Sequence, residues 1–203
     1  MEHTDNLITL RGQLAQVPGF SHENHGKRFY RFVLDVPRLS GTVDSLPVVA
    51  EQSLLGHWQP EPGCQVTVTG QIRSHNLRRE GQRHLMIFVF ANLLVPEPGD
   101  SLNDVMLEGI ICRSPTYRQT PLGREICDVM LAVPRGFQRS DYLPCILWGK
   151  TAQQVSQGLP GDRLRIRGRL QSRSYTKATP EGAVQRTAYE ISALTGDMIP
   201  DSQ

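Results

Sequence analysis

Five arginines share the odd-numbered positions of one short segment in the C-terminal half of the chain. Within residues 163–175 the even positions from Leu164 to Leu170 are apolar or glycine, and the odd positions are Arg163, Arg165, Arg167, Arg169, Gln171, Arg173 and Tyr175. Because side chains alternate between the two faces of a strand, this pattern predicts an outward cationic stripe that ends in an aromatic ring. Like charges this close repel one another, so the stripe favours a polyanion that lies along it and releases counterions. The alternative is a solvated face with acidic partners on neighbouring strands. The acidic residues of this half are scattered along the sequence, which argues against that alternative.

Aromatic side chains interleave with further cations in the same half of the chain. The rings are Phe137, Tyr142, Trp148 and Tyr175, and the cations around them are Arg135, Arg139, Lys150 and Arg173. This combination is typical of single-stranded nucleic-acid binding, in which bases stack on rings while cations hold phosphates. For Trp148, which lies in an apolar run, core packing and base stacking both remain open.

The segments around these residues predict a small barrel of strands. Runs enriched in β-branched and apolar residues occupy 105–112, 126–133, 142–149, 163–170 and 187–193, and 150–158 is the one helix-like segment. Five strands with a helix between the third and fourth predict a five-stranded Greek-key barrel of the OB type. Gly109 and Gly168, inside two of the strands, suit the tight bends that close such a barrel.

The same pattern of residues occurs twice along the chain. The segment from Asn6 to Gly12 is echoed by that from Asn103 to Gly109, 97 positions later, and Gly70 is echoed by Gly168 at an offset of 98. A duplicated domain explains this repetition, so the expected fold is all-β, with two tandem OB barrels in one chain. The expected divisions are a first OB domain over residues 1–94, a linker over 95–102, a second OB domain over 103–197 and a short tail over 198–203.

Residues 103–195 resemble the bacterial single-stranded DNA-binding protein (SSB) family over its whole OB domain. The motifs that carry the resemblance are Asn103-x-Val105-x-Leu107-x-Gly109, the run from Pro115 to Gly123, the run from Tyr142 to Ala152, and the run from Gly161 to Tyr175. The resemblance implies a protein that coats single-stranded DNA without sequence preference in replication, recombination or repair. It also implies that Phe137, Tyr142, Trp148 and Tyr175 stack on bases. The pattern of cations itself predicts that the arginines above and Lys150 contact phosphates.

The resemblance carries expectations about assembly and location as well. Members of the family wrap DNA around four OB domains, so a chain with two of them is expected to form a homodimer. The expected location is the bacterial cytoplasm, at the nucleoid or encoded on a phage or mobile element. This sequence lacks the long tail with an acidic tip that recruits partners in the family, so recruitment by that route is not expected, and replication or repair proteins are candidate partners only.

The first copy departs from the family at the binding positions. The places that align with the four rings hold Ser40, Ser45, Glu51 and Leu77, none of them aromatic. Basic residues near its expected hairpin offer secondary phosphate contacts, at Arg73, Arg78, Arg79 and Arg83. An alternative function is therefore a protein-interaction or assembly module, like a primosomal accessory protein.

Other function classes find no support in the sequence. No nucleophile elbow, Walker loop or cluster of carboxylates is present, so we expect neither an enzyme nor a cofactor. Four cysteines without C-x-x-C spacing predict no metal site. No apolar run reaches the ~20 residues of a membrane helix, and a secretory signal is not expected. The formal net charge of +2 is small, but the stripe shows that placement matters more than the sum.

Overall fold

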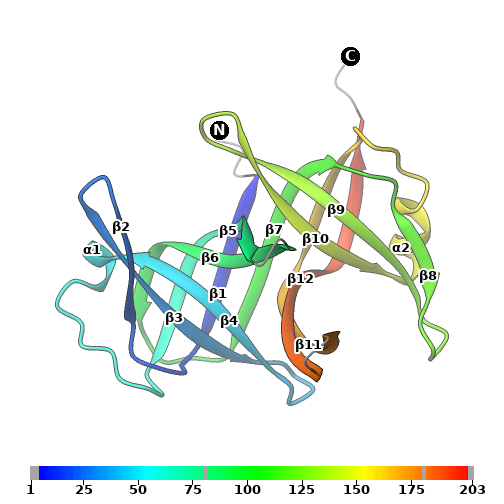
Figure 1. Cartoon of the computed structure of the whole chain (residues 1–203). Coiled ribbons are helices and arrows are strands. Elements are labelled where there is room, and N and C mark those ends of the chain that lie inside the picture. The colour runs from blue at the N-terminus through cyan, green and yellow to red at the C-terminus, as the bar shows by residue number, and fades with distance from the viewer. Residues whose placement is uncertain (1–4, 80–81, 180–181, 201–203) are drawn as a thin grey trace.

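The computed structural model of the chain describes residues 5–79, 82–179 and 182–200. Its strands form two barrels that lie side by side (Figure 1). The first half contains β1 (Asn6–Leu14), β2 (Gly19–Asn24), β3 (Lys27–Pro37), β4 (Val43–Glu51), α1 (Gln52–Leu55), β5 (Gln65–Arg79) and β6 (Gln82–Pro96). The second half contains β7 (Leu102–Ile111), β8 (Thr116–Gln119), β9 (Glu125–Arg135), β10 (Arg139–Trp148), α2 (Gly149–Val155), β11 (Arg163–Thr179) and β12 (Gly182–Ile199).

Each half closes into a five-stranded barrel with the connectivity of an OB fold. In the second half β7 pairs with β9, β9 with β10, β10 in parallel with β12, β12 with β11, and β11 again with β7. The first half repeats the circuit through β1, β3, β4, β6 and β5. The prediction of an all-β chain with two tandem OB barrels is confirmed. The short strands β2 and β8, which the sequence analysis did not predict, extend the edges beside β3 and β9.

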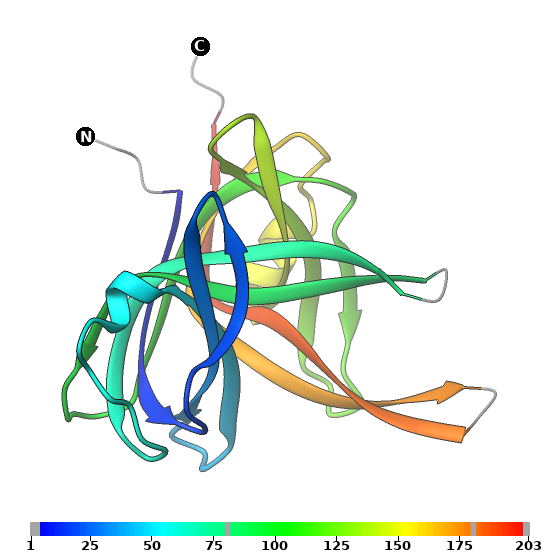
Figure 2. The same ribbon diagram turned by 60° about the vertical axis from the view of Figure 1, so that its left-hand side comes forward.

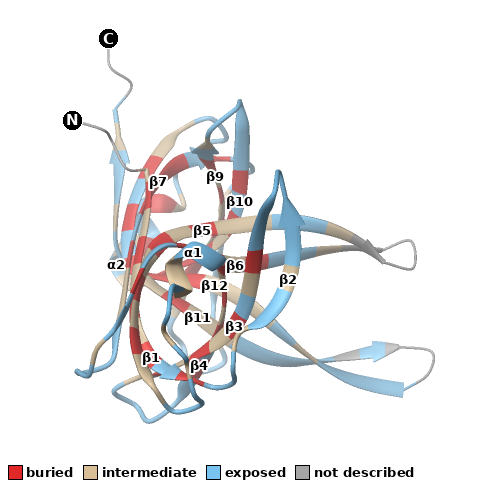
Figure 3. Ribbon diagram, turned by 90° about the vertical axis from the view of Figure 1, so that its left-hand side faces the viewer, coloured by how far each residue is buried: buried red, intermediate tan, exposed pale blue. Residues whose placement is uncertain are grey.

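Alternating apolar side chains fill the barrels. Along β11, for example, Leu164, Ile166, Gly168 and Leu170 are buried and the residues between them are not. Figure 3 shows the buried residues along the barrel strands and the exposed ones toward the hairpin ends. This is the alternation from which the strands were predicted.

Two equivalent glycines allow the close approach of neighbouring strands. A Cβ atom at Gly70 would lie 2.1 Å from the carbonyl oxygen of Phe90, and one at Gly168 would lie 2.2 Å from that of Ser192. The pairing register also shifts at both glycines, next to Thr69 in one barrel and next to Arg167 in the other. The expectation that Gly168 marks a tight bend is therefore confirmed, and its counterpart does the same.

The two barrels share a continuous sheet. β1 and β7 pair antiparallel, with Leu7 opposite Met106 and Thr9 opposite Asp104. Since β5 and β6 extend this pair on one side and β11 and β12 on the other, six neighbouring strands join the halves.

Each barrel also extends a long hairpin toward the other barrel. We call residues 71–79 and 82–90 of β5–β6 the first arm, and residues 169–179 and 182–192 of β11–β12 the second arm; Figure 2 shows both leaving the barrels. The second arm runs well beyond the expected segments 163–170 and 187–193. The alternation from Arg163 to Tyr175 indicated part of its first strand, but the polar residues beyond Tyr175 gave no signal of the remainder.

A buried aspartate of each barrel holds the arm of the other. Asp44 accepts the backbone N–H of Ser172 at 2.7 Å, and Asp141 accepts that of Ser74 at 2.6 Å. Both carboxylates are fully buried. The two contacts are related by the sequence repeat, so the halves meet about an approximate twofold axis.

Among the residues that the structure describes, no helix is long and apolar enough to cross a membrane.

Candidate single-strand interface

The outward face of β10 carries two of the predicted rings. Asp141, Leu143, Cys145 and Leu147 point into the barrel and are buried. On the alternate face Tyr142 is exposed and Pro144 is partly exposed, whereas Ile146 is only 6% exposed. Tyr142 is 45% exposed on this face. Trp148 lies six residues further along the strand, which corresponds to a distance of about 20 Å. At the other end Trp148 is half-buried, and its indole Nε1–H donates to Ser192 Oγ at 3.0 Å. One edge of the indole is therefore held while part of the ring remains open to solvent.

Phe137 lies in the turn that joins β9 to β10. The structure leaves its ring 99% exposed, and its φ of 63° lies in the left-handed region, as does that of Gln138. A phenyl ring wholly in water contributes nothing to the core, whereas a stacked base would remove it from water. The exposure fits the predicted stacking role.

Tyr175 lies on the second arm and not on the barrel wall. It is 39% exposed, and the guanidinium of Arg173 lies 5.9 Å from its ring centroid. Arg173 also lies 4.0 Å from a carboxylate oxygen of Glu190, a long ion pair in which the arginine is exposed and the glutamate is mostly buried. These two residues therefore form a ring and a cation that lie together on the arm.

The cations nearest the rings differ in how they are engaged. Arg139 and Lys150 are exposed, and within the described part of the chain neither has a carboxylate oxygen within 4.0 Å. Arg135, in contrast, donates to the buried Asp141 at 3.4 Å. Arg139 and Lys150 are thus the cations best placed to meet a phosphate.

The arginine stripe of β11 faces carboxylates, contrary to the sequence-based expectation. Glu108 pairs with both Arg163 and Arg165, the latter at 2.8 Å, and Asp104 pairs with Arg167 at 2.9 Å. The expectation that acidic residues are scattered is therefore wrong. They lie along β7, and the antiparallel register of β7 and β11 brings them beside arginines more than 50 positions away.

Glu108 shows how strongly this network is coupled. Burial alone would raise the pKa of its carboxyl, but hydrogen bonds and charge from Arg165 and Arg163 outweigh burial and hold the pKa below its usual value. The carboxylate of Glu108 thus stays charged although the side chain is only 8% exposed. Three of the five arginines of the stripe therefore share two carboxylates before any ligand arrives.

The stripe and the rings also lie on different walls of the barrel. β11 has β7 and β12 as neighbours, whereas β10 has β9 and β12. Arg169 lines a cavity of about 430 Å³ together with Arg38, Asp44 and Asn103, and its Nε is buried without a hydrogen-bond partner among the described residues. Of the predicted phosphate contacts on β11, only Arg173 shares a surface with a predicted ring.

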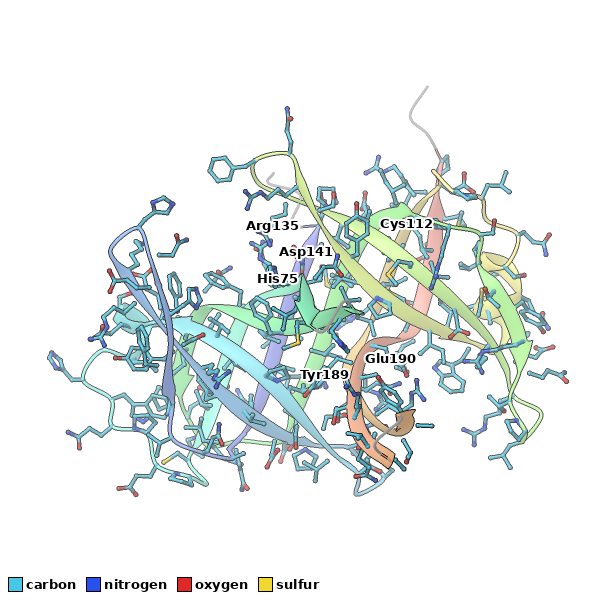
Figure 4. The ribbon with its side chains drawn as sticks, viewed as in Figure 1. His75, Cys112, Arg135, Asp141, Tyr189 and Glu190 are labelled. Carbon is cyan, nitrogen blue, oxygen red and sulfur yellow. The ribbon has the colours of Figure 1, made fainter. Side chains whose placement is uncertain are left out.

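The first arm meets the second barrel beside Tyr142. The backbone N–H of Tyr142 donates to Ser74 Oγ at 2.7 Å, and Arg73 donates to Asp141 at 3.1 Å. Figure 4 labels His75, the residue that follows Ser74 on the arm, together with Asp141 and Arg135 of the second barrel. Arg73, predicted as a secondary phosphate contact, therefore lies in the joint between the barrels. Sequence reasoning missed Ser74 and Asp141 because no local pattern marks them.

The other predicted contacts of the first barrel are either undescribed or engaged in other interactions. The side chains of Arg78, Arg79 and Arg83 lie outside the described residues. At the positions that correspond to the rings, Ser45 donates to Asp35 at 2.6 Å and Glu51 pairs with Lys27 at 2.9 Å.

Comparison with known proteins identifies a family and relatives of this chain. A family model described as the single-strand binding protein family matches residues 102–199. Over 80 residues the chain is 38% identical to single-stranded DNA-binding protein B of Bacillus subtilis (strain 168), covering 36% of this chain and 71% of that protein. It is 37% identical over 81 residues to a single-stranded DNA-binding protein of Halalkalibacterium halodurans, again covering 36% of this chain but 48% of that protein. The chain thus spans about half the length of several of its curated relatives.

A solved structure matches both barrels. The wild-type single-stranded DNA binding protein from Thermus aquaticus superposes with a TM-score of 0.80, covering 98% of this chain and 94% of that one. The sequence identity is 23%, so this likeness establishes the tandem-barrel fold.

Proposed function

Because the chain belongs to the single-strand binding protein family, we propose that it binds single-stranded DNA through the rings and free cations of its second barrel. The observation that carries the proposal is the outward face of β10. Tyr142 is exposed there, Trp148 is partly open at its far end, and Arg139 and Lys150 lie close to the two ends without carboxylate partners among the described residues. Phe137 and the pair of Arg173 and Tyr175 extend the surface beyond the strand.

This surface binds by stacking and charge, with no chemical step. Each stacked base contributes ~1–3 kcal/mol, and every base offers a face to a ring, so binding tolerates any sequence. Cations that hold phosphates release counterions, which makes the affinity fall with salt. A protein of this kind protects single strands during replication, recombination or repair, in the cytoplasm where the DNA lies. A role mainly in protein assembly is not favoured, because the relatives that the chain matches are named as single-stranded DNA-binding proteins.

We further propose that the two barrels divide the chain as the sequence repeat indicates, with domains over 1–94 and 103–197, a linker between them and a tail over 198–203. The strand ends lie within two residues of these boundaries, since β6 ends at Pro96, β7 begins at Leu102 and β12 ends at Ile199.

A homodimer is the proposed assembly, and the six-stranded sheet offers a face for it. Apolar side chains lie on the outward side of this sheet, among them Leu93, Met106 and Ile110, which are 53%, 44% and 43% exposed. The paired arginines of β11 lie on the same side, since Arg167 is opposite Met106. Light scattering after size exclusion is expected to give twice the chain mass, and Met106→Glu is expected to halve it. A wild-type monomer across micromolar concentrations would rule out the dimer.

Tryptophan fluorescence tests the DNA-binding proposal. The chain has two tryptophans, so Trp58→Phe leaves Trp148 as the single reporter. Titration with oligo-dT at two salt concentrations is expected to quench Trp148 and to give weaker binding at higher salt. Tyr142→Ala in the same background is expected to weaken binding. Unchanged fluorescence together with undetectable binding of a labelled oligonucleotide would refute the proposal.

A further inference from the structure

The β2–β3 hairpin of the first barrel carries a pair of rings, one exposed and one partly buried, that the sequence analysis did not single out. Phe20 and Tyr30 are cross-strand neighbours, their ring centroids lie 6.0 Å apart, and the rings meet edge to face at 83°. Phe20 is 52% exposed, so half of this large apolar side chain stays in water. The first barrel therefore does carry aromatic surface, but on a different strand from the positions that align with the family's rings.

A cation accompanies the rings. The guanidinium of Arg28 lies 5.1 Å from the Phe20 ring centroid and 6.0 Å from that of Tyr30. Within the described residues no carboxylate oxygen lies within 4.0 Å of Arg28, although Glu23 is its cross-strand partner. The corresponding hairpin of the second barrel differs, because Arg118 there is held by Asp128 at 2.6 Å. Arg28 is thus a cation whose hydrogen-bond donors remain available.

A hollow opens beside Arg28. Its volume is about 450 Å³, and it is lined by residues of the β2–β3 turn and of α1, including Lys27, Arg28, Ser53 and His57. Glu51 also lines it, but Lys27 pairs with that carboxylate at 2.9 Å. The volume of this open hollow falls within the range of small-ligand sites.

The hairpin lies on the same end of the molecule as the proposed site. In Figures 1, 2 and 3 the β2–β3 hairpin and the β9–β10 hairpin project toward the same end, although they belong to different barrels. Phe137 occupies the turn of the β9–β10 hairpin. A strand that leaves this turn can therefore continue onto the first barrel without passing to the opposite end.

We propose that Phe20, Arg28 and Tyr30 form a second contact for the same single strand of DNA, and this inference rests on the function proposed above. A base stacks on the exposed face of Phe20, and Arg28 and the hollow beside it receive the adjoining phosphate. The contact is tolerant of sequence, because it uses a ring face and a charge. The first barrel then extends the bound length of DNA beyond the second barrel.

Anisotropy of a fluorescein-labelled (dT) oligonucleotide of about 35 nucleotides tests the contact in the full chain. Phe20→Ala is expected to weaken binding about tenfold. Arg28→Ala is expected to lower the slope of log affinity against log salt by about 0.7, the value for one phosphate of a single strand. Val17→Ala is the matched control, because Val17 is 56% exposed just before the same hairpin and carries neither a ring nor a charge.

Phe20→Trp adds a readout that a purely structural role would not affect. The fluorescence that the new tryptophan adds to that of the wild-type protein is expected to be quenched when the oligonucleotide binds. If Phe20→Ala and Arg28→Ala bind like Val17→Ala while Tyr142→Ala binds weakly, the second contact is refuted and the proposed function stands. If Tyr142→Ala also binds like the parent, the proposed site on β10 fails as well. A lower melting temperature of Phe20→Ala with unchanged affinity would assign the rings to hairpin stability and overturn the inference.

Discussion

The Oδ1 atom of Asp44, fully buried in the first barrel, accepts the backbone N–H of Ser172 from the second arm at 2.7 Å. The same carboxylate accepts two hydrogen bonds from Arg38, at 2.6 and 2.7 Å. One buried charge therefore satisfies a cation of its own barrel and a backbone donor of the other. Asp141 repeats the arrangement with Ser74, Arg73 and Arg135.

Removal of either carboxylate is expected to destabilise the whole chain. Asp44→Ala leaves Arg38 without its partner and the N–H of Ser172 unsatisfied, and losing one partner of a buried pair costs ~3–5 kcal/mol. Asp141→Ala is expected to cost a similar amount. Urea unfolding measures both. Asp128→Ala is the control, since its pair with Arg118 is exposed and exposed pairs contribute under ~1 kcal/mol. Equal losses for all three variants would contradict the interpretation.

Gly168→Ala is expected to be poorly tolerated, because the new methyl group meets the Ser192 carbonyl at 2.2 Å and the backbone has to move. Overpacking of this kind costs ~1–3 kcal/mol, and a clash with backbone belongs at the upper end of that range. The free energy of unfolding in urea checks the value. Gly136→Ala is the matched control, with no atom within 4 Å of the added Cβ. A loss no larger than that of the control would show that the strands can separate freely at this point.

The barrels could be predicted from the sequence, whereas the contacts between their strands could not. Alternation along segments such as that from Leu164 to Leu170 indicates a strand and its buried face, because one face of each strand must be apolar. No local pattern in the sequence of a strand indicates which other strand it pairs with. Arg165 and Glu108 are 57 positions apart, so only the register of β7 and β11 reveals that they pair.

In the candidate site, too, some features could be predicted from the sequence and others could not. The exposure of Phe137 and Tyr142 follows from polar surroundings and strand parity, both of which can be read from the sequence. The hydrogen bond from Tyr142 to Ser74 spans 68 positions, and the side-by-side arrangement of Phe20 and Tyr30 depends on a strand, β2, that was not predicted. Assignment of the stripe to phosphate binding remains a prediction, now weakened by its carboxylate partners.

Salt dependence separates the stripe from the free cations. Lys150→Ala is expected to lower the slope of log affinity against log salt by about 0.7, because Lys150 gives up no ion pair to hold a phosphate. Arg167→Ala is expected to leave the slope nearly unchanged, since Asp104 already neutralises Arg167. Titrations of oligo-dT at four salt concentrations give both slopes. A larger change for Arg167→Ala would restore the stripe as the main phosphate track.

The Glu108 network is expected to make stability fall in acid. The folded-state pKa of Glu108 is lowered, so its contribution is complete above the unfolded value of 4.5 and disappears as the pH falls through the folded value. Glu108→Gln removes this contribution. The difference in the free energy of unfolding between wild type and variant is therefore expected to be largest near neutral pH and to shrink below about pH 4.5. A difference that stays constant with pH would place the benefit of Glu108 in packing and not in charge.

The reciprocal hold of Asp44 and Asp141 has a consequence for how this molecule can evolve. In a homo-oligomer every substitution is repeated in every copy, so an interface and a ligand surface must change together in all subunits. Joining two copies in one polypeptide removes that restriction. Here the symmetry survives at the joint, where each half needs the other, and has been lost at the surfaces: the positions that carry Tyr142 and Trp148 in one half carry Ser45 and Glu51 in the other. Covalent linkage has left each barrel free to acquire its own ligand chemistry while its neighbour keeps it folded.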